Sequence, residues 1–446
     1  MTKPKKERPA ILRDRNFQWL LGGGILSMLG DQFTMLALPW LVLTMTNDPL
    51  ALGLVIAIMS VPRAVFMLVG GAIVDRYSPK RVMMATKYVN AALLGALAWL
   101  VLAAPALLSL PLLYALALGL GLAQAFAIPA GTSMMPQVVP PQHLQAANGV
   151  MMGLRQMVML AGPVLAALLI AIGGDGGGTG SGTGAGPASA NASAIHAPAG
   201  AVGIGIAFAF DCFTFLFTVW TLAKVQTRAD AAPPPGATGQ SIFSSVAEGL
   251  ATVWRDAALR TCFIYWSVVS VFVGGTMQVA LPLLASQNLH GAASFGILSG
   301  AHGAGSLIGM ALSGAGVRLR FGTFGATLLA VDAIAALLFA PLGFITATWQ
   351  GAGLLLAMGV LGGFIQIAVF SWIQGSVPPR MLGRAMSIFM FIFMGLAPLS
   401  AAAIGALLLH VTLAQLFTGG AAVLLAITLL AWLLTPMRSI GAAGQP

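Results

Sequence analysis

Long apolar stretches separated by short polar connectors run through the whole 446-residue chain. A helix needs about 20 apolar residues to cross the roughly 30 Å hydrocarbon core of a bilayer, and twelve stretches are long enough. They begin near Phe17, Leu50, Tyr88, Leu110, Asn148, Gly200, Thr261, Ser294, Phe324, Gly351, Ala385 and Leu413. The pattern predicts an all-α polytopic membrane protein with twelve transmembrane helices.

Basic residues fall almost entirely on one side of these stretches. Of the 21 Lys and Arg residues, 19 precede the first stretch, follow the last, or lie in even-numbered connectors, while Arg63 and Arg155 lie inside stretches. Basic residues near span ends are retained on the cytoplasmic side, so both termini are predicted to be cytoplasmic. The apolar run from Phe17 to about Met45 is too long for a secretory signal and is interpreted as the first span.

Composition excludes several function classes. A mean hydropathy of +0.93 leaves no room for a sizeable soluble domain. The net charge of +10 lies beside span ends, which favours anionic lipid headgroups over nucleic acid as its partner. Cys212 and Cys262 lack metal-ligand spacing, and neither a nucleophile–base pair nor a phosphate-binding loop appears. We therefore expect no enzyme, no metal and no cofactor.

Two long connectors differ in character. Residues 173–200 are almost entirely Gly, Ala, Ser and Thr, which is typical of a flexible loop, here extracytoplasmic. Residues 224–260 form the longest cytoplasmic connector, with three consecutive prolines at 233–235 and then apolar residues at helical spacing between Ile242 and Trp254. That spacing indicates either an amphipathic helix on the inner membrane face or part of a small cytoplasmic packing layer.

An internal repeat divides the chain. The segment VPPQHLQAA at 139–147 recurs as VPPRMLGRA at 377–385, 238 residues later, each time in a cytoplasmic turn that enters the next span. Such placement indicates a duplicated six-span unit, and parallel halves of this kind characterise one major class of secondary transporter. The predicted organisation is a six-helix bundle over 1–222, a cytoplasmic linker with an amphipathic helix over 223–260, and a second bundle over 261–446.

The loop after the second span carries a recognisable motif. GAIVDRYSPKR at 71–81 resembles G-x-x-x-D-R-x-G-R-K-R, the signature of the major facilitator superfamily. The arrangement of twelve spans in two halves also resembles that superfamily. The matching positions are Gly71, Asp75, Arg76, Lys80 and Arg81, whereas Ser78 replaces a glycine and Pro79 a basic residue.

The resemblance implies that this loop bridges the halves on the cytoplasmic side and steadies the outward-facing state. Asp75 and Arg76 would then have a gating role, because a carboxylate and guanidinium groups form charge-assisted contacts that can switch. The alternative is a basic loop that only sets topology.

Three further segments are similar to bacterial exporters related to macrolide-efflux and enterobactin-export proteins. They are RNFQWLLGGGILSMLGDQFTMLALPWLV, PQVVPPQHLQAANG and VPPRMLGRAMS. This resemblance implies a location in the bacterial inner membrane. Gly162 and Pro163 fit the centre of the antiporter motif G-x-x-x-G-P-x-x-G-G, which favours export, although Val158, Ala166 and Ala167 replace its other glycines. The arginine that many proton-coupled members carry in the fourth span is missing.

Charged residues inside a membrane are costly and usually mark an ion or substrate path. The candidates are Asp31, Arg63, Arg155, Asp211 and Asp332. We hypothesise that Asp31 titrates protons or senses a cation, coupled to Arg63 or Arg155, since a low dielectric opposes ionisation of a carboxylate and a guanidinium favours it. A static salt bridge between helices is the alternative. Asp211 and Asp332 either join this path or hydrogen-bond a neighbouring helix.

These features together predict a secondary active transporter that works by alternating access as a monomer. We expect it to export an amphipathic small molecule, such as a drug, a macrolide-like or a siderophore-like compound, in exchange for protons. One alternative is a proton-coupled importer or symporter of a small metabolite. Another, from a different class, is a membrane sensor or scaffold that has kept a transporter fold.

Overall fold

The computed structural model describes residues 14–140, 143–174, 201–227, 254–289, 291–314, 321–377, 388, 389, 392 and 396–441. Ten helices in these ranges are long and apolar enough to cross a membrane. Two shorter apolar helices, Pro49–Arg63 and Pro398–Leu407, stand at the positions of the second and eleventh spans. The predicted all-α fold with twelve membrane helices is therefore confirmed.

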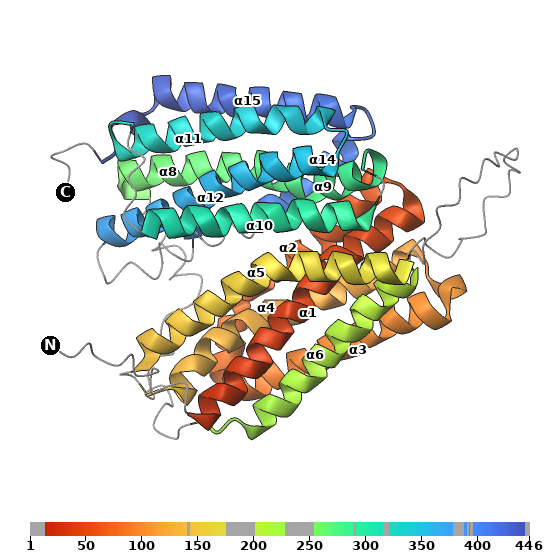
Figure 1. Cartoon of the computed structure of the whole chain (residues 1–446). Coiled ribbons are helices and arrows are strands. Elements are labelled where there is room, and N and C mark those ends of the chain that lie inside the picture. The colour runs from red at the N-terminus through yellow and green to blue at the C-terminus, as the bar shows by residue number, and fades with distance from the viewer. Residues whose placement is uncertain are drawn as a thin grey trace, which may run out of the picture.

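The helices form two bundles, one from each half of the chain (Figure 1). The first contains α1 (Arg15–Thr46), α2 (Pro49–Tyr77), α3 (Pro79–Ala103), α4 (Leu110–Val138), α5 (Leu144–Gly174) and α6 (Ala201–Lys224), with the short 3₁₀ helix η2 (Pro105–Leu107) before α4.

In the second bundle, the seventh span consists of α8 (Ala257–Val269), a π-helical turn η5 (Ser270–Gly274) and α9 (Gly275–Gln287). The remaining elements are α10 (Ala292–Gly314), α11 (Phe324–Phe339) with η6 (Ala340–Phe344), α12 (Thr348–Ser376), α14 (Ala397–Leu407), α15 (Leu413–Leu434) and η8 (Pro436–Ser439).

Several of the rare charged residues start helices. Asp14 accepts a hydrogen bond from the backbone of Asn16 at 2.8 Å, and Asp48 does the same for Leu50 at 2.8 Å. Asp256 caps α8 in the same way. A carboxylate at this position satisfies backbone N–H groups that have no partner within the helix. These three acidic residues are thus accounted for by helix capping.

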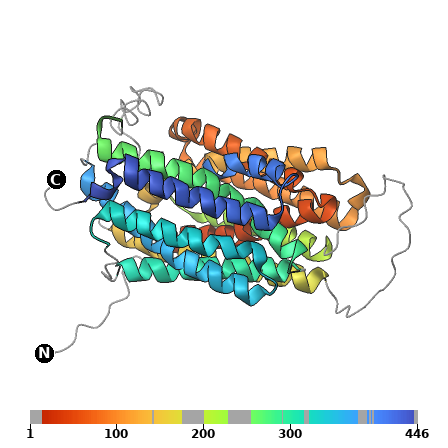
Figure 2. The same cartoon turned by 90° about the horizontal axis from the view of Figure 1, so that it is seen from above.

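The two bundles meet through α5 with α10 and through α2 with α14. Glycines make the close approach possible, because a Cβ at Gly53 would overlap the backbone carbonyl of Ala401, and one at Gly405 would lie 2.5 Å from the carbonyl of Pro49. The Gly53 and Gly405 contacts lie where α2 begins and α14 ends, whereas the contact of α5 with α10 continues along both helices to Gln156 and Met310, whose side chains bond at 3.3 Å. We call the end of the molecule where α2 begins the opposite side, and the end where α1 begins and α15 ends the termini side (Figures 1 and 2).

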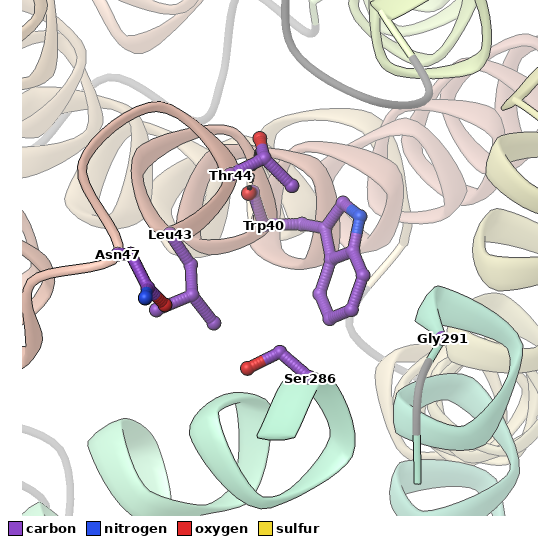
Figure 3. Close-up of a pocket in the computed structure, with 6 residues that line it drawn as sticks. All are labelled: Trp40, Leu43, Thr44, Asn47, Ser286 and Gly291. Carbon is purple, nitrogen blue, oxygen red and sulfur yellow. Dashed lines mark hydrogen bonds between the residues drawn. The ribbon is translucent and has the colours of Figure 1, made fainter. Parts of the chain in front are cut away.

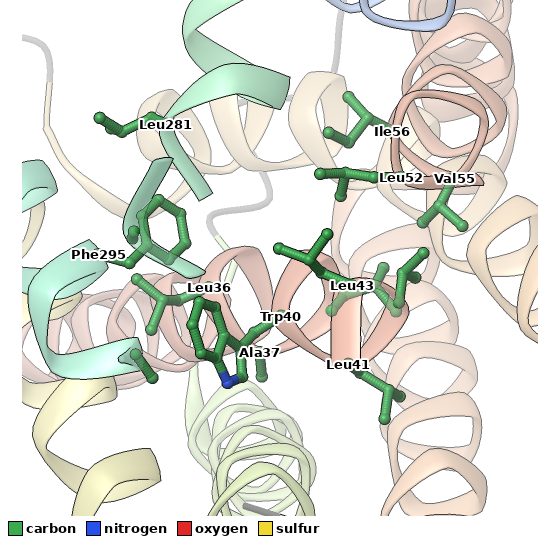
Figure 4. Packing of buried hydrophobic residues seen from close by; sticks show 14 of the residues in the cluster. Leu36, Ala37, Trp40, Leu41, Leu43, Leu52, Val55, Ile56, Leu281 and Phe295 are labelled. Atoms are coloured by element: carbon green, nitrogen blue, oxygen red, sulfur yellow. The ribbon is translucent and has the colours of Figure 1, made fainter. Parts of the chain in front are cut away.

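The hydrophobic core follows the same division. The largest buried cluster combines both halves at the opposite side, where Leu36 and Trp40 of α1 pack with Leu281 of α9 and Phe295 of α10 (Figure 4). On the termini side each bundle has a separate cluster. That of the first bundle includes Phe17, Met134 and Leu222, and that of the second includes Phe263, Trp266 and Ile373. The bundles are therefore packed together at the opposite side and have independent cores at the termini side.

The start of α3 differs from the sequence-based expectation. We expected the third span to begin near Tyr88, but α3 begins at Pro79, directly after the loop motif. Lys87, which we had assigned to the connector, is therefore inside the helix, and it is buried. The predicted amphipathic helix and most of the glycine-rich loop lie outside the described residues, and the domain boundaries remain a prediction.

Candidate functional site

Asp31 lies at the middle of the 32-residue helix α1. Its Oδ1 accepts a hydrogen bond from Nε2 of Gln124 in α4 at 3.4 Å, and Oε1 of Gln124 accepts one from Nη1 of Arg63 in α2 at 3.1 Å. An amide side chain can serve both ions because it carries a donor and an acceptor. Gln124 thus connects the carboxylate and the guanidinium, and no direct ion pair joins the two in the described part of the chain.

Lys87 holds a positive charge between α1, α3 and α6. Its Nζ donates to Oγ of Ser27 at 2.6 Å and lies 4.3 Å from the centre of the Phe215 ring. The charges of Asp31 and Asp211 both act on this ammonium. A buried cation requires such partners, because desolvation otherwise costs several kcal/mol. Lys87 is therefore part of the same electrostatic group as Asp31.

Asp211 is fully buried in α6, facing α1. The hydroxyl of Thr34 donates to Oδ2 of Asp211, and Thr214 donates to Oδ1 at 3.1 Å. Gly30 makes room for this arrangement, because a Cβ there would overlap both Asp211 and Thr214. The missing side chain of Gly30 lets the carboxylate lie against the backbone of α1.

The resulting network contains two carboxylates, Asp31 and Asp211, and two cations, Arg63 and Lys87, so its formal charges cancel. Charges interact strongly in a low dielectric, and one added proton would leave the network with a net charge of +1. Asn90, one turn after Lys87 in α3, is 1% exposed, and among the residues that the structure describes neither its side-chain oxygen nor its nitrogen has a hydrogen-bonding partner. Buried amides are almost always hydrogen-bonded, so this position has unused capacity for an internal water or a ligand.

Arg155 is not linked to this network. It lies in α5, half-buried, and in the described part of the chain no hydrogen bond or ion pair connects it to Asp31. Of the two guanidiniums that we considered as partners of Asp31, the structure connects Arg63 and leaves Arg155 apart.

The antiporter-like motif lies where α5 contacts α1 of its own bundle and α10 of the second bundle. A Cβ at Gly162 would lie 2.6 Å from Cγ of Gln32, the residue after Asp31 in α1. The carbonyl of Pro163 and the side chain of Ala167 face Gly296 of α10. Where the family motif has a glycine in this helix, the present chain has Ala167, and Gly296 supplies the small residue from the other bundle.

The loop between α2 and α3 is attached to the end of α6. Nζ of Lys80 donates to the carbonyls of Val225 at 2.7 Å and Ala223 at 3.4 Å, which suits a cation at a helix C-terminus. Just beyond, Asn16 and Gln226 exchange two hydrogen bonds of 2.6 and 2.7 Å between the side chain of Asn16 and the backbone of Gln226. The loop and the chain leaving α6 are therefore both tied to the first bundle.

One departure from the motif lies at a backbone position that favours glycine. Ser78 has φ = 76°, a conformation that favours glycine, and it replaces the glycine of the signature. Arg81 is exposed in the first turn of α3, while Gly71, Asp75 and Arg76 belong to α2 and their side chains lie outside the described part.

A separate polar cluster lies in the second bundle. The hydroxyl of Tyr265 in α8 donates to Oδ2 of Asp332 in α11 at 2.7 Å, and it lies 3.3 Å from Oγ1 of Thr428 in α15. Asp332 therefore belongs to a different polar cluster from Asp31, and the two do not form the single path of charges that we considered.

A cavity of ≈ 380 Å³ opens at the opposite side, between the end of α1 and the second bundle (Figure 3). Its lining residues are Trp40, Leu43, Thr44, Asn47, Ser286 and Gly291. Since it contains none of the predicted site residues, it is a depression at the junction of the bundles and is distinct from the charged network.

Sequence reasoning missed Lys87 because it was assigned to a connector, and it missed the neutral members of the network because only charged residues were considered. A usable signal existed: Ser27, Asp31 and Thr34 have the spacing i, i+4, i+7, which places them on one face of α1. That face carries the contacts to Lys87, Gln124 and Asp211.

Two helical bundles with charges held inside their spans define a multi-pass membrane transporter. The sequence profile described as Major Facilitator Superfamily matches residues 20–402. The chain therefore belongs to the major facilitator superfamily, whose members carry small molecules across lipid bilayers. No curated protein sequence matches it significantly.

Solved structures with the same fold cover nearly the whole chain. The nucleoside transporter NupG has 15% identity and a TM-score of 0.65, covering 93% of this chain and 97% of its own. A bacterial homologue of the iron transporter ferroportin, in an inward-facing state, has 17% identity and a TM-score of 0.66, covering 94% of this chain and 97% of its own. A D-xylose-proton symporter has 12% identity and a TM-score of 0.66, covering 94% of this chain and 98% of its own. Because these proteins differ in substrate, the similarity identifies the fold alone.

Proposed function

We propose that this transporter exports an amphipathic small molecule in exchange for protons, from a bacterial inner membrane in which both termini are cytoplasmic. The observation that carries the proposal is the charge-balanced network of the first bundle, in which Asp31 reaches Arg63 through Gln124, and Lys87, bonded to Ser27 on the same face of α1, is attracted by the charges of Asp31 and Asp211. Four charges within transmembrane helices are costly to maintain, which favours a role in coupling over a role in packing.

Asp31 is the proton-binding group in this proposal. Protonation removes its charge, weakens its bond from Gln124 and reduces its attraction for Lys87 and Arg63. Because these partners lie on α2, α3 and α4, the change alters the packing energy between α1 and three neighbouring helices. A proton that binds one conformation of the bundle more tightly than the other shifts the equilibrium between them.

The packing of the two bundles supports alternating access. Their joint hydrophobic cluster lies at the opposite side, whereas the termini side has separate cores. With cytoplasmic termini, this arrangement corresponds to an inward-facing state, as named for the ferroportin homologue. In the other state the α2–α3 loop would contact the second bundle, where Asp75 and Arg76 would have their gating role.

Two features favour export and an amphipathic substrate. Gly162 faces Gln32, the residue after Asp31 in α1, and Pro163 faces Gly296 of α10, so the antiporter-like motif lies between the helix that carries the proposed proton site and the other bundle. Only 7% of the residues are charged, which suits a drug-like, macrolide-like or siderophore-like molecule better than a highly charged one.

Inside-out membrane vesicles test this function. With the vesicle interior acidified, the wild-type protein is expected to accumulate members of a panel of fluorescent amphipathic dyes. Asp31→Asn is expected to abolish this accumulation while the protein remains in the membrane. The matched control is Asp48→Asn, because asparagine caps a helix as well as aspartate and Asp48 lies outside the network.

Each other outcome has a definite meaning. Unchanged accumulation in Asp31→Asn removes Asp31 from the mechanism. Accumulation only with the opposite pH gradient indicates a symporter or importer. Absence of flux for every compound, together with a stable protein partner, indicates a scaffold or sensor.

A further inference from the structure

The third helix of each bundle carries one ionisable residue at the same position. Lys87 and Asp332 each lie eight residues after the first residue of their helices, Pro79 and Phe324. This corresponds to about 12 Å along the helix axis. Both side chains are thus at a similar depth from the termini side.

Each of the two residues bonds to the first helix of its own bundle. Lys87 bonds to Ser27 and Asp332 to Tyr265. Ser27 and Tyr265 are 238 residues apart, which is also the spacing of the two VPPxxLxxA segments. Lys87 and Asp332 themselves are 245 residues apart, because α3 and α11 start 245 residues apart, so the two charges correspond by their place in the helix and by the helix they bond to.

The surroundings of the two residues differ. Lys87 has two carboxylates whose charges act on it. Asp332 has no such counter-charge, because α12, α15 and η6, which pack against α11, contain no titratable side chain in their described ranges. Of the remaining neighbours, η8 contributes the exposed Arg438, and α8 contributes Tyr265, Cys262 and Arg260. Arg260 lies near the start of its helix, where it bonds to the carbonyl of Trp254.

The hydrogen bonds around Asp332 can satisfy both of its protonation states. With the carboxylate charged, the hydroxyl of Tyr265 donates to Oδ2 at 2.7 Å. With a proton on Oδ2, the carboxyl group donates to the Tyr265 oxygen, and Tyr265 donates to Thr428 at 3.3 Å. Thr428 can accept, because its own hydrogen is given to the carbonyl of Leu424 at 2.8 Å. The chain of bonds reverses at one link and leaves no donor unpaired.

We propose that Asp332 is a second proton-binding site of this transporter, with Tyr265 and Thr428 as the groups that accommodate the proton. The proposal rests on the proposed proton coupling and extends it to the second bundle. An isolated carboxylate inside a membrane is costly. A proton bound to Asp332 removes this cost, and the hydroxyl groups of Tyr265 and Thr428 can form hydrogen bonds with the protonated form. Uptake of this proton changes the bonding between α8, α11 and α15.

Infrared difference spectroscopy of the purified protein in lipid, between acidic and alkaline pH, tests the site with protons as the only probe. A protonated carboxyl group has a carbonyl-stretch band that a carboxylate lacks. We expect one such band to be lost in Asp332→Asn and to shift in Tyr265→Phe and Thr428→Val, because their hydrogen bonds to the cluster change. Asp256→Asn, which alters a helix cap, is the matched control and should leave the band in place.

The outcomes separate this proposal from the proposed function. A spectrum that is the same in Asp332→Asn as in the wild type overturns the second site, whatever the dyes show. Should Asp332→Asn fail to fold, an unshifted spectrum in Tyr265→Phe has the same meaning. Loss of a different band in Asp31→Asn reports on the first bundle alone, and dye accumulation that is insensitive to pH overturns proton coupling while leaving proton binding at Asp332 measurable.

Discussion

Asp31 and Arg63 are joined through the side chain of Gln124, which donates to the carboxylate at 3.4 Å and accepts from the guanidinium at 3.1 Å. A neutral residue, Gln124, thus links two charged residues that lie on α1 and α2. Replacing Gln124 tests the hydrogen-bonded link while both charges remain in place.

Gln124→Leu should uncouple transport from the proton gradient while both ions remain. Hydrogen bonds to charged groups contribute about 1.5–3 kcal/mol, so pH-driven dye accumulation in inside-out vesicles should fall roughly tenfold or more. Gln350→Leu serves as the control, because Gln350 only caps α12 at the opposite side. Equal accumulation in both variants would show that the amide bridge has no part in coupling.

Lys87→Met should destabilise the protein by leaving two buried carboxylates with one cation. Removing one partner of a buried charge pair costs about 3–5 kcal/mol. The double variant Lys87→Met with Asp211→Asn should recover much of this loss, since it removes one charge of each sign. Thermal unfolding in detergent, followed by tryptophan fluorescence, measures both effects.

The comparison for Lys87 is Lys80→Met, in which a lysine loses only its bonds to backbone carbonyls at the end of α6. Its cost should be about 0.3–1 kcal/mol. A double variant that is no more stable than Lys87→Met would mean that Asp211 and Lys87 do not balance each other.

Ser78→Gly should stabilise the protein. At φ = 76° a side chain is strained, and relief of this strain is expected to contribute about 1 kcal/mol. Ser109→Gly provides the contrast, because Ser109 precedes α4 with an ordinary extended φ of −126° and should gain nothing. The midpoint of thermal unfolding distinguishes the two, and a lower midpoint for Ser78→Gly would contradict the argument from strain.

Gly296→Ala should shift the equilibrium between conformations, because its methyl group would overlap Ala167 where α10 meets α5. Overpacking costs about 1–3 kcal/mol, which disfavours the state that is closed at the opposite side. Spin labels at Arg15 and Arg438, both exposed on the termini side, should then move closer together.

Adding Ala167→Gly to this variant should restore the original distance, because it removes the overlapping methyl group from α5. Gly353→Ala is the control, since open space surrounds Gly353 in α12. An unchanged distance in Gly296→Ala would argue against this contact as part of the alternating movement.

The sequence predicted the number of spans and the two halves because apolar length and the repeated segments depend only on local composition. It placed Lys87 in a connector, because Thr86 and Tyr88 make that stretch look polar. A helix beginning at Pro79 puts the lysine more than two turns inside α3. The depth of a residue depends on where its helix begins, and a window of hydropathy does not resolve that position.

The pairing of site residues could not be predicted for a different reason. Asp31 meets Gln124 and Asp211 meets Thr34 because particular glycines and threonines fix how the helices slide and rotate against one another. A single sequence shows which residues share a helix face, but not which face of the next helix they meet. Formal charge indicated Asp31, Arg63 and Asp211, and the neutral partners became visible only through packing.

The bonds that hold Gln226 to Asn16 and Val225 to Lys80 also set where the tether between the bundles begins. Up to Gln226 the chain is fixed to the first bundle and turns with it as one rigid body. In any movement of one bundle against the other, the chain through Gln226 therefore belongs to the first bundle, two residues beyond the end of α6 at Lys224.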